Sequence, residues 1–124
     1  MNGTDILADT NAIIYFVNGN DCMKPYRNNC FNVSIISEME LLSFPAITES
    51  ETNRIKAVIN KCIEINIDTA IKEKTIELRK KYSTKLPDSI IAATAICRGL
   101  KLVTADKGFS KIEELNLQLI EPVM

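Results

Sequence analysis

The chain has 124 residues, of which 46% are hydrophobic and 25% charged, and its formal net charge is −1. This composition excludes a disordered, collagen-like or coiled-coil protein, and the length predicts one domain over residues 1–124. We expect a cytoplasmic protein with no membrane partner, because no apolar run is long enough to span a bilayer and no signal-peptide pattern is present.

Short apolar runs alternate with helical patterns along the whole chain. The runs typical of buried strands are residues 4–8, 33–36, 64–67, 101–104 and 117–120. Strands that alternate with helices predict an α/β fold with right-handed crossovers and a mostly parallel sheet of about five strands.

Helical patterns fill the intervals between these strands. After the second strand, Ser37 and Glu40 have the spacing of a capping box, which predicts that a helix begins there. Residues 50–63 carry apolar side chains at helical intervals, and Asp68 can cap the helix that follows. Residues 90–96 are apolar on nearly every side, which predicts a central helix.

The residues available for chemistry are restricted. The chain has four cysteines and no histidine, and no two cysteines have the CxxC spacing. A zinc site and a Ser-His or Cys-His triad therefore lack their residues. We expect Cys62 and Cys97 to be buried thiols on apolar helix faces, so acid–base or metal chemistry must rest mainly on carboxylates.

Four acidic residues occupy equivalent positions, where a strand ends or a helix begins. Asp9 follows the first strand and Asp106 follows the fourth. Glu40 lies in the first turn after the second strand, and Asp88 lies in the first turn of the central helix. Ligand sites of parallel sheets lie beyond the carboxyl ends of the strands, so we expect these acids to share one pocket.

Each acid alone also has a structural explanation, as a helix cap or as a partner of a helix dipole. Together they would crowd one edge of the sheet, where two carboxylates about 4 Å apart repel by roughly 4 kcal/mol at an effective dielectric constant of 20. Either some are protonated or a divalent cation neutralises them. Oxygen ligands suit Mg²⁺ or Mn²⁺, which indicates metal-assisted phosphodiester hydrolysis.

Four motifs resemble those of PIN-domain ribonucleases, most closely the VapC-type toxins of bacterial toxin–antitoxin pairs. They are LADTNAIIYF, ISEMELLSF, LPDSIIAATA and LVTADKGF, in the family's order and at fitting intervals. The resemblance implies a three-layer α/β/α fold with sheet order 3-2-1-4-5. It also implies a Mg²⁺- or Mn²⁺-dependent ribonuclease that forms homodimers and binds a small antitoxin protein.

By the same resemblance, the metal-binding and catalytic residues are Asp9, Glu40, Asp88 and Asp106. Asn11 and Thr104 match small polar positions that orient these acids. Glu38 is the nearest rival of Glu40, and a rotation of about 100° per helical residue prevents both from pointing equally into one pocket.

A basic stretch in the middle of the chain is a candidate for RNA contact. Residues 54–85 hold nine basic and four acidic residues. The candidates within it are Lys72, Arg79, Lys80 and Lys81, which could equally form an ordinary solvated helix face. Lys24 and Arg27, on either side of Tyr26, are a second candidate because a base could stack on the ring.

Two other classes of function remain open. A receiver-type signalling domain has a similar size and Mg²⁺ use and could accept phosphate on Asp68, but Asp9 has no acidic neighbour and Glu121 stands where a lysine is needed. A catalytically silent PIN-like interaction domain would be expected to have lost one or more of the four acids. A dinucleotide-binding module is excluded, because no glycine follows the first strand.

Overall fold

Five short strands form a single parallel sheet at the centre of the computed structural model, which describes residues 5–28 and 30–123. The strands are β1 (Ile6–Ala8), β2 (Asn32–Ser34), β3 (Ile63–Ile65), β4 (Lys101–Thr104) and β5 (Leu117–Leu119). Their order is β3-β2-β1-β4-β5, and every neighbouring pair is parallel. The predicted order 3-2-1-4-5 is confirmed, and β1 lies between two partners.

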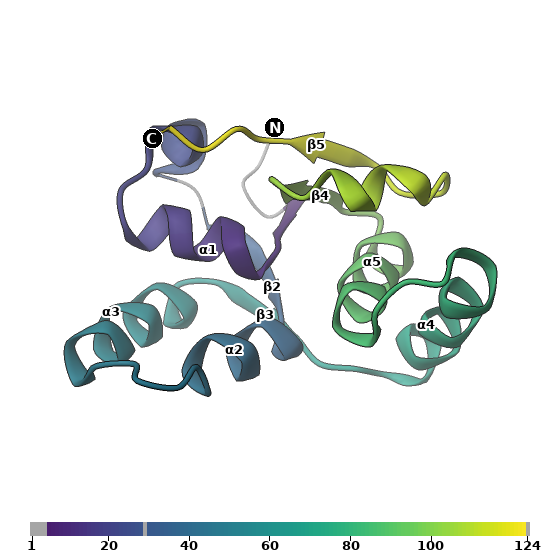
Figure 1. The fold of residues 1–124 in the computed structure, drawn as a ribbon, viewed down its shortest axis with the longest axis horizontal. Helices are drawn as coiled ribbons and strands as arrows, with labels where there is room; N and C mark the ends of the chain where they lie inside the picture. The colour runs from purple at the N-terminus through teal and green to yellow at the C-terminus, as the bar shows by residue number, and fades with distance from the viewer. Residues whose placement is uncertain (1–4, 29, 124) are drawn as a thin grey trace.

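Helices connect the strands and cover both faces of the sheet (Figure 1). They are α1 (Thr10–Val17), η2 (Asp21–Tyr26), α2 (Ile35–Leu42), α3 (Glu49–Asn60), α4 (Thr69–Tyr82), α5 (Leu86–Arg98) and η3 (Lys107–Lys111). In Figure 1, α1 and α3 lie on one side of the sheet and α4 and α5 on the other, while α2 contacts α1, α3 and α5. Among the described residues, no helix combines the length and apolar character that crossing a membrane requires.

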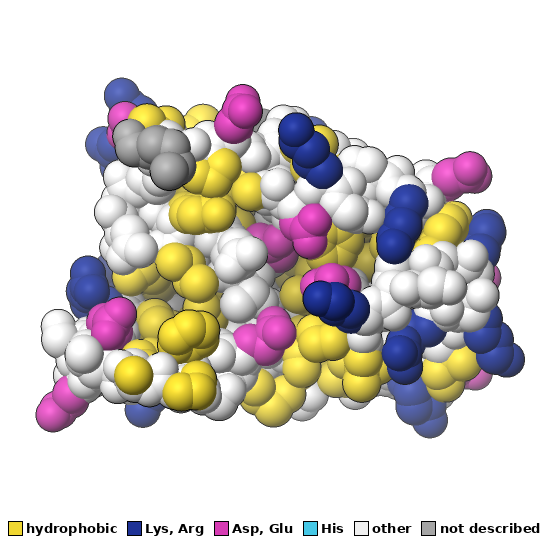
Figure 2. All heavy atoms as spheres, in the orientation of Figure 1, with side chains coloured by type: hydrophobic (Ala, Val, Ile, Leu, Met, Phe, Trp, Pro, Cys, Tyr) yellow, Lys and Arg dark blue, Asp and Glu magenta, His cyan; other side chains and the backbone are white. Residues whose placement is uncertain are grey.

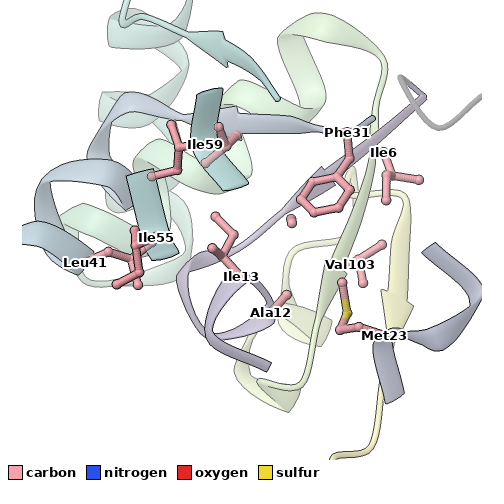
Figure 3. Packing of buried hydrophobic residues seen from close by; sticks show 11 residues of the cluster. Ile6, Ala12, Ile13, Met23, Phe31, Leu41, Ile55, Ile59 and Val103 are labelled. Atoms are coloured by element: carbon pink, nitrogen blue, oxygen red, sulfur yellow. The ribbon is translucent and has the colours of Figure 1, made fainter. Parts of the chain in front are cut away.

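The side chains of β1 alternate between the two faces, which gives the sheet a core on each side. Ile6 and Ala8 belong to one buried cluster and Leu7 to the other. In the first cluster they lie with Ile13 of α1 and Ile59 of α3 (Figure 3). Alternate side chains of β1 are therefore buried under helices on opposite faces of the sheet, which gives a three-layer α/β/α arrangement.

The second cluster packs α4 and α5 against the other face. Ile71 of α4 and both Ala92 and Ala93 of α5 are fully buried. α5 is buried at every position from Ser89 to Ala95, which confirms the prediction of a central helix. It ends at Gly99, which has the left-handed φ of 65° that glycine adopts without a steric cost.

The helix after β2 has its N-cap three residues earlier than the sequence predicts. Ser34 caps α2 by accepting a hydrogen bond from the Ile36 N–H at 3.2 Å. Ser37 is fully buried inside α2, so the predicted capping box with Glu40 is wrong. The predicted strand 33–36 also ends early, because a short apolar run fits a strand and a helix equally well.

A capping box does occur in the structure, at the start of the next helix. The Thr48 side chain accepts from the Glu51 N–H at 3.0 Å, and the Glu51 carboxylate accepts from the Thr48 N–H at 3.1 Å. α3 ends at Asn60, so the prediction of a helix over 50–63 is too long at its carboxyl end.

The other predicted strands differ from the structure only at their ends. β3 and β5 are each three residues long, against the predictions 64–67 and 117–120. Residue 4 of the first predicted strand lies outside the described residues. Short strands lose pairing at their termini, where side-chain patterns contain the least information.

The prediction of two buried thiols is wrong. Cys97 is exposed, because the buried face of α5 ends at Ala95. Cys62 is half-buried and follows α3 rather than lying within it.

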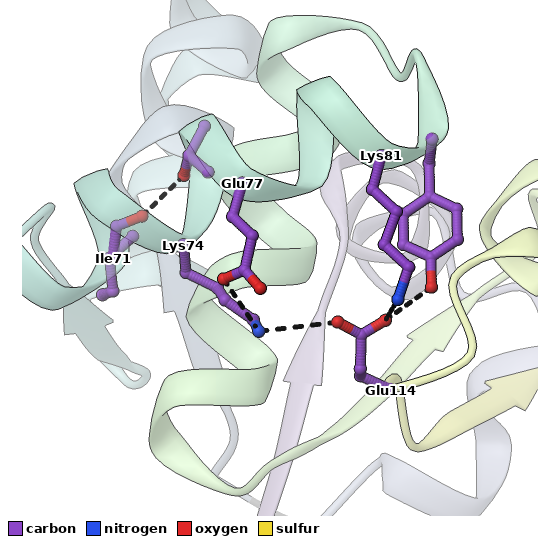
Figure 4. Close-up of polar contacts among 7 residues, drawn as sticks. Ile71, Lys74, Glu77, Lys81 and Glu114 are labelled. Atoms are coloured by element: carbon purple, nitrogen blue, oxygen red, sulfur yellow. Dashed lines mark hydrogen bonds and ion pairs between the residues drawn. The ribbon is translucent and has the colours of Figure 1, made fainter.

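One carboxylate joins α4 to the segment that precedes β5 (Figure 4). The Tyr82 hydroxyl donates to Glu114 Oε1 at 2.6 Å, and Lys74 Nζ lies 3.5 Å from Glu114 Oε2. Lys81 Nζ lies 3.9 Å from Glu114 Oε1, and Lys74 also pairs with Glu77 at 3.2 Å. The Tyr82 hydrogen bond is the largest of the interactions that lower the pKa of Glu114.

We predict that Tyr82→Phe lowers the free energy of unfolding by about 1 kcal/mol, because the carboxylate loses its hydroxyl donor. Chemical denaturation measures this change. Tyr15→Phe is the matched control, since the Tyr15 hydroxyl makes no hydrogen bond to a described residue, and it should change stability by less than about 0.5 kcal/mol. Equal effects of the two substitutions would contradict this assignment.

Candidate active site

Asp9 lies directly after β1, at the carboxyl edge of the sheet, and it is only 4% exposed. Its backbone is extended, and Oδ1 accepts a hydrogen bond from the Ala12 N–H at 2.8 Å. Asp9 is therefore the N-cap of α1, as the structural explanation requires. Capping engages Oδ1 and leaves Oδ2 for a second partner.

Thr104, the last residue of β4, supplies that second partner and links two of the acids. Its hydroxyl donates to Asp9 Oδ2, and its Oγ1 accepts from the Asp106 N–H at 3.0 Å. Thr104 is fully buried, whereas the Asp106 side chain is exposed and accepts from the Gly108 N–H at 2.8 Å. A Cβ on Gly108 would lie 3.0 Å from Asp106 Oδ1, so glycine leaves this carboxylate its position.

Glu40 approaches the site from the second turn of α2, not the first turn that the sequence predicts. Thr10 Oγ1 donates to Glu40 Oε1 at 2.7 Å and lies 3.0 Å from Ser37 Oγ. Glu38 instead lies close to the Glu64 side chain, and this neighbour is the main cause of the raised pKa of Glu64. Of the two rivals, Glu40 is therefore the one beside the Asp9–Thr10 segment.

Asp88 lies in the first turn of α5, as predicted, and it is half-buried. The segment around it is held by hydrogen bonds that leave the carboxylate free. The Lys85 carbonyl accepts from the Ser89 N–H at 2.9 Å and from its hydroxyl at 2.8 Å. Thr84 and Ser89 hydrogen-bond through their hydroxyls, and Arg79 Nε donates to the Thr84 carbonyl at 3.2 Å.

The four acids interact electrostatically although they come from separate parts of the chain. The pKa of Asp9 is raised to about 6, first by burial and then by the charges of Asp106 and Asp88, against the hydrogen bonds from Thr104 and Ala12, which lower it. The pKa of Asp88 is also raised, first by burial and then by Asp106 and Glu40. Figure 2 shows acidic side chains gathered around the hollow at the centre of this face.

Two lysines oppose this repulsion at Asp88. The charges of Lys85 and Lys111 lower its pKa, against the burial and the acids that raise it. Both side chains are exposed. The acids of the site therefore repel one another, while Lys85 and Lys111, the lysines at the rim of the site, partly offset this repulsion at Asp88.

The donor set fits a hard divalent cation in its chemistry, since every charged ligand is a carboxylate oxygen. Within residues 5–28 and 30–123, however, no three acidic, cysteine or histidine side chains are grouped closely enough to hold an ion. The mutual charge effects on Asp9 and Asp88 favour such an ion. Asp106 is exposed and Glu40 half-exposed, so the carboxylates have room to close around it.

Asn11, predicted to orient the acids, has an exposed side chain without a hydrogen bond to any described acid. With Thr10 and Glu40 it lines a groove of about 610 Å³ between α1, α2 and α3. Much of this groove is apolar, and Phe44 on its wall is 69% exposed.

The basic residues predicted to contact RNA occupy different surroundings. On α4, Lys81 lies beside Glu114, Arg79 is engaged by the Thr84 carbonyl, and Lys72 and Lys80 are exposed. Their contact with RNA stays a prediction.

The second pair of candidates lies near η2. Lys24 is exposed within η2. Arg27 lines a separate cavity together with Phe31 and Cys62, which precede β2 and β3. That cavity is at the amino edge of the sheet, opposite the acids.

Sequence reasoning missed several polar neighbours of the acids. Thr10 directly follows Asp9, and a hydroxyl next to a buried acid is a signal that could have identified it. Ser37 was assigned to a helix cap instead. Lys85 is three positions before Asp88, a local signal that was not used, whereas Lys111 approaches Asp88 only through the fold.

Comparison with known proteins agrees with this architecture. A family model described as the PIN domain matches residues 6–115. A toxin–antitoxin complex from Klebsiella pneumoniae contains a chain that is 32% identical, with a TM-score of 0.76 over 89% of this chain and 94% of that one. Curated protein sequences gave no match.

Two further solved structures are similar at 22% identity, which shows the shared fold. VapBC2 from Rickettsia felis, bound to a DNA fragment from its promoter, has a TM-score of 0.80 over 94% of this chain and 98% of that one. VapBC-1 from nontypeable Haemophilus influenzae has a TM-score of 0.77 over 92% and 96%. With its sheet order, and a family model that matches most of its length, the chain belongs to the PIN-domain family.

Proposed function

We propose that this chain is a Mg²⁺- or Mn²⁺-dependent endoribonuclease and the toxin of a toxin–antitoxin pair, acting on RNA in the cytoplasm as a homodimer. Its metal-binding and catalytic residues would be Asp9, Glu40, Asp88 and Asp106. The observation that carries the proposal is the burial of Asp9 among other acids at the carboxyl edge of the sheet. A carboxylate in that position is costly unless a cation or a proton neutralises it.

Bound Mg²⁺ or Mn²⁺ would supply charge neutralisation and Lewis acidity toward a phosphodiester. The chain's own groups hold the acids in place. Thr104 and the Ala12 N–H fix the two oxygens of Asp9, and Thr10 orients Glu40. A carboxylate of the site can accept a hydrogen bond from the attacking water and direct it at phosphorus.

The alternatives have less support. The receiver-type alternative is wrong, because such domains have the sheet order 2-1-3-4-5 rather than the order found here. Asp68 instead caps α4 and pairs with Arg98 at 3.1 Å. A catalytically silent PIN-like domain remains the second candidate, and the activity of the acid variants distinguishes it.

The partner we propose is a small antitoxin protein, as in the Klebsiella pneumoniae toxin–antitoxin complex. The apolar groove between α1, α2 and α3 begins at Glu40 and is lined by Ile14, Phe44 and Ile47. An apolar segment of the antitoxin in this groove would bury Phe44 and reach the acids at the same time.

We predict that Asp9→Asn and Asp88→Asn each abolish Mn²⁺-dependent RNA cleavage while the protein remains folded. The reason is the loss of a charged ligand with almost no change in shape. Gel assays of RNA cleavage, with circular dichroism as the folding check, measure both properties. Asp68→Asn is the matched control and should cleave like the wild type, whereas full turnover by either site variant would refute the metal site.

We predict that Asp9→Asn also removes a pH dependence of stability. The pKa of Asp9 is about 6 in the folded state, against 3.8 for an aspartate in the unfolded chain, so the folded state holds this proton more tightly. Stability from this group is therefore lost as pH rises from about 4 to about 6, by about 3 kcal/mol in all. The free energy of unfolding, measured across this range, should fall for the wild type as pH rises, and the variant should become the more stable of the two.

Asp68→Asn is again the control, with the opposite sign. The Ile71 N–H and then Arg98 lower the pKa of Asp68, so its contribution to stability is lost as pH falls. If the stability of the wild type and of Asp9→Asn changed with pH in the same way, the pKa of Asp9 would not be raised in the folded state.

We also predict that millimolar Mn²⁺ at neutral pH raises the melting temperature of the wild type and not that of Asp9→Asn.

We predict that Phe44→Asp weakens binding of the protein encoded by a small open reading frame next to this gene. Co-expression of the two proteins and co-purification measure the complex. Ile76→Asp is the control, because Ile76 is 50% exposed and lies on α4, away from the groove. Retention of the complex by Phe44→Asp, or its equal loss in the control, would argue against the groove as the docking site.

A further inference from the structure

The side chains of two lysines beside the acid cluster form no ion pair with any described residue. We propose that Lys85 and Lys111 bind backbone phosphates of the RNA and so position the strand over Asp88 and its neighbouring carboxylates. This inference rests on the proposed ribonuclease function and names the residues that bring a polyanion to an acidic site.

Lys85 is the N-cap residue of α5, three positions before Asp88. Its backbone is fixed, since its carbonyl accepts both the N–H and the hydroxyl of Ser89. Its side chain is exposed and makes no cap hydrogen bond. The ammonium group is thus attached to a rigid point next to the acids and is free to move over them.

Lys111 also has an anchored backbone and an exposed side chain, and it belongs to a different element. It is the last residue of η3, the short helix that Asp106 caps. Phe109 and Ile112 are 4% and 2% exposed, and the Ile112 N–H donates to the Phe109 carbonyl at 3.1 Å. These buried neighbours anchor the turn while the Lys111 side chain remains in solvent.

Both ammonium groups reach the site electrostatically without forming an ion pair. Among the described residues, neither nitrogen lies within 4.0 Å of a carboxylate oxygen, yet both charges act on Asp88. Lys74 and Lys81 differ, because Glu114 already engages them. Figure 2 shows basic side chains beside the acidic group at the central hollow.

This arrangement addresses a problem that the acids create. A site with four carboxylates repels the phosphodiester that it must bind, and the chain as a whole has a net charge of −1. Cations at the rim of the hollow attract phosphates locally without neutralising the carboxylates themselves. Lysine suits this role, since its compact charge on a flexible stem can follow a moving backbone.

The test uses Lys85→Ala, Lys111→Ala and the double variant of the full chain, with a short single-stranded RNA of mixed sequence as the probe. Each single substitution should raise KM for Mn²⁺-dependent cleavage roughly two- to fivefold and leave kcat nearly unchanged. Lys→Arg at the same position should restore KM. Lys56→Ala on α3, also exposed, is the matched control and should behave as the wild type.

Binding measured in the Asp88→Asn background separates this inference from the proposed function. There, the dependence of log affinity on log salt should become shallower by about 0.7 for each lysine removed. If the lysine variants showed a shallower salt dependence but the wild type cleaved no RNA, phosphate binding by the lysines would be supported and the ribonuclease function overturned. Unchanged KM and salt slope, or a fall in kcat alone, would overturn the role of the lysines.

Discussion

The structure depends on a carboxylate that is buried at the end of its central strand. Asp9 follows β1, the strand with a partner on each side, and it is only 4% exposed. Burial, and to a smaller extent the nearby acids, raise its pKa to about 6. Parallel strands bring their carboxyl ends to one edge, so the same topology that builds the core also gathers the acids there. In the function we propose, a divalent cation neutralises these acids.

The surrounding polar groups divide into those that hold the acids and those that face the solvent. Thr104 joins Asp9 to the backbone of Asp106, and Thr10 joins the Asp9 segment to Glu40 of α2. These hydroxyls orient oxygens without adding charge. The lysines of the rim, in contrast, are anchored through their backbones and remain free at their tips, which suits contact with a mobile polyanion.

The sequence predicted the sheet order through the resemblance of its four motifs to a known family. It placed Asp9, Asp88 and Asp106 directly, because strand ends and a first helical turn are local features. It was insufficient where one pattern fits two structures: Ser34 and Ser37 can both cap a helix, and the run between them fits a strand as well as a helix. The neighbours of the acids could not be predicted, since contacts such as Thr10 to Glu40 span thirty positions and exist only after folding.

We propose that these four carboxylates bind a divalent cation together. A crystal structure grown with Mn²⁺ tests it most directly, because the anomalous scattering of manganese locates the ion independently of any activity. We expect a strong peak in contact with Asp9 and with at least two of the other three acids, whose side chains have turned toward it. Manganese bound only elsewhere on the surface, at saturating concentration and with the four acids still apart, would show that they do not form a metal site.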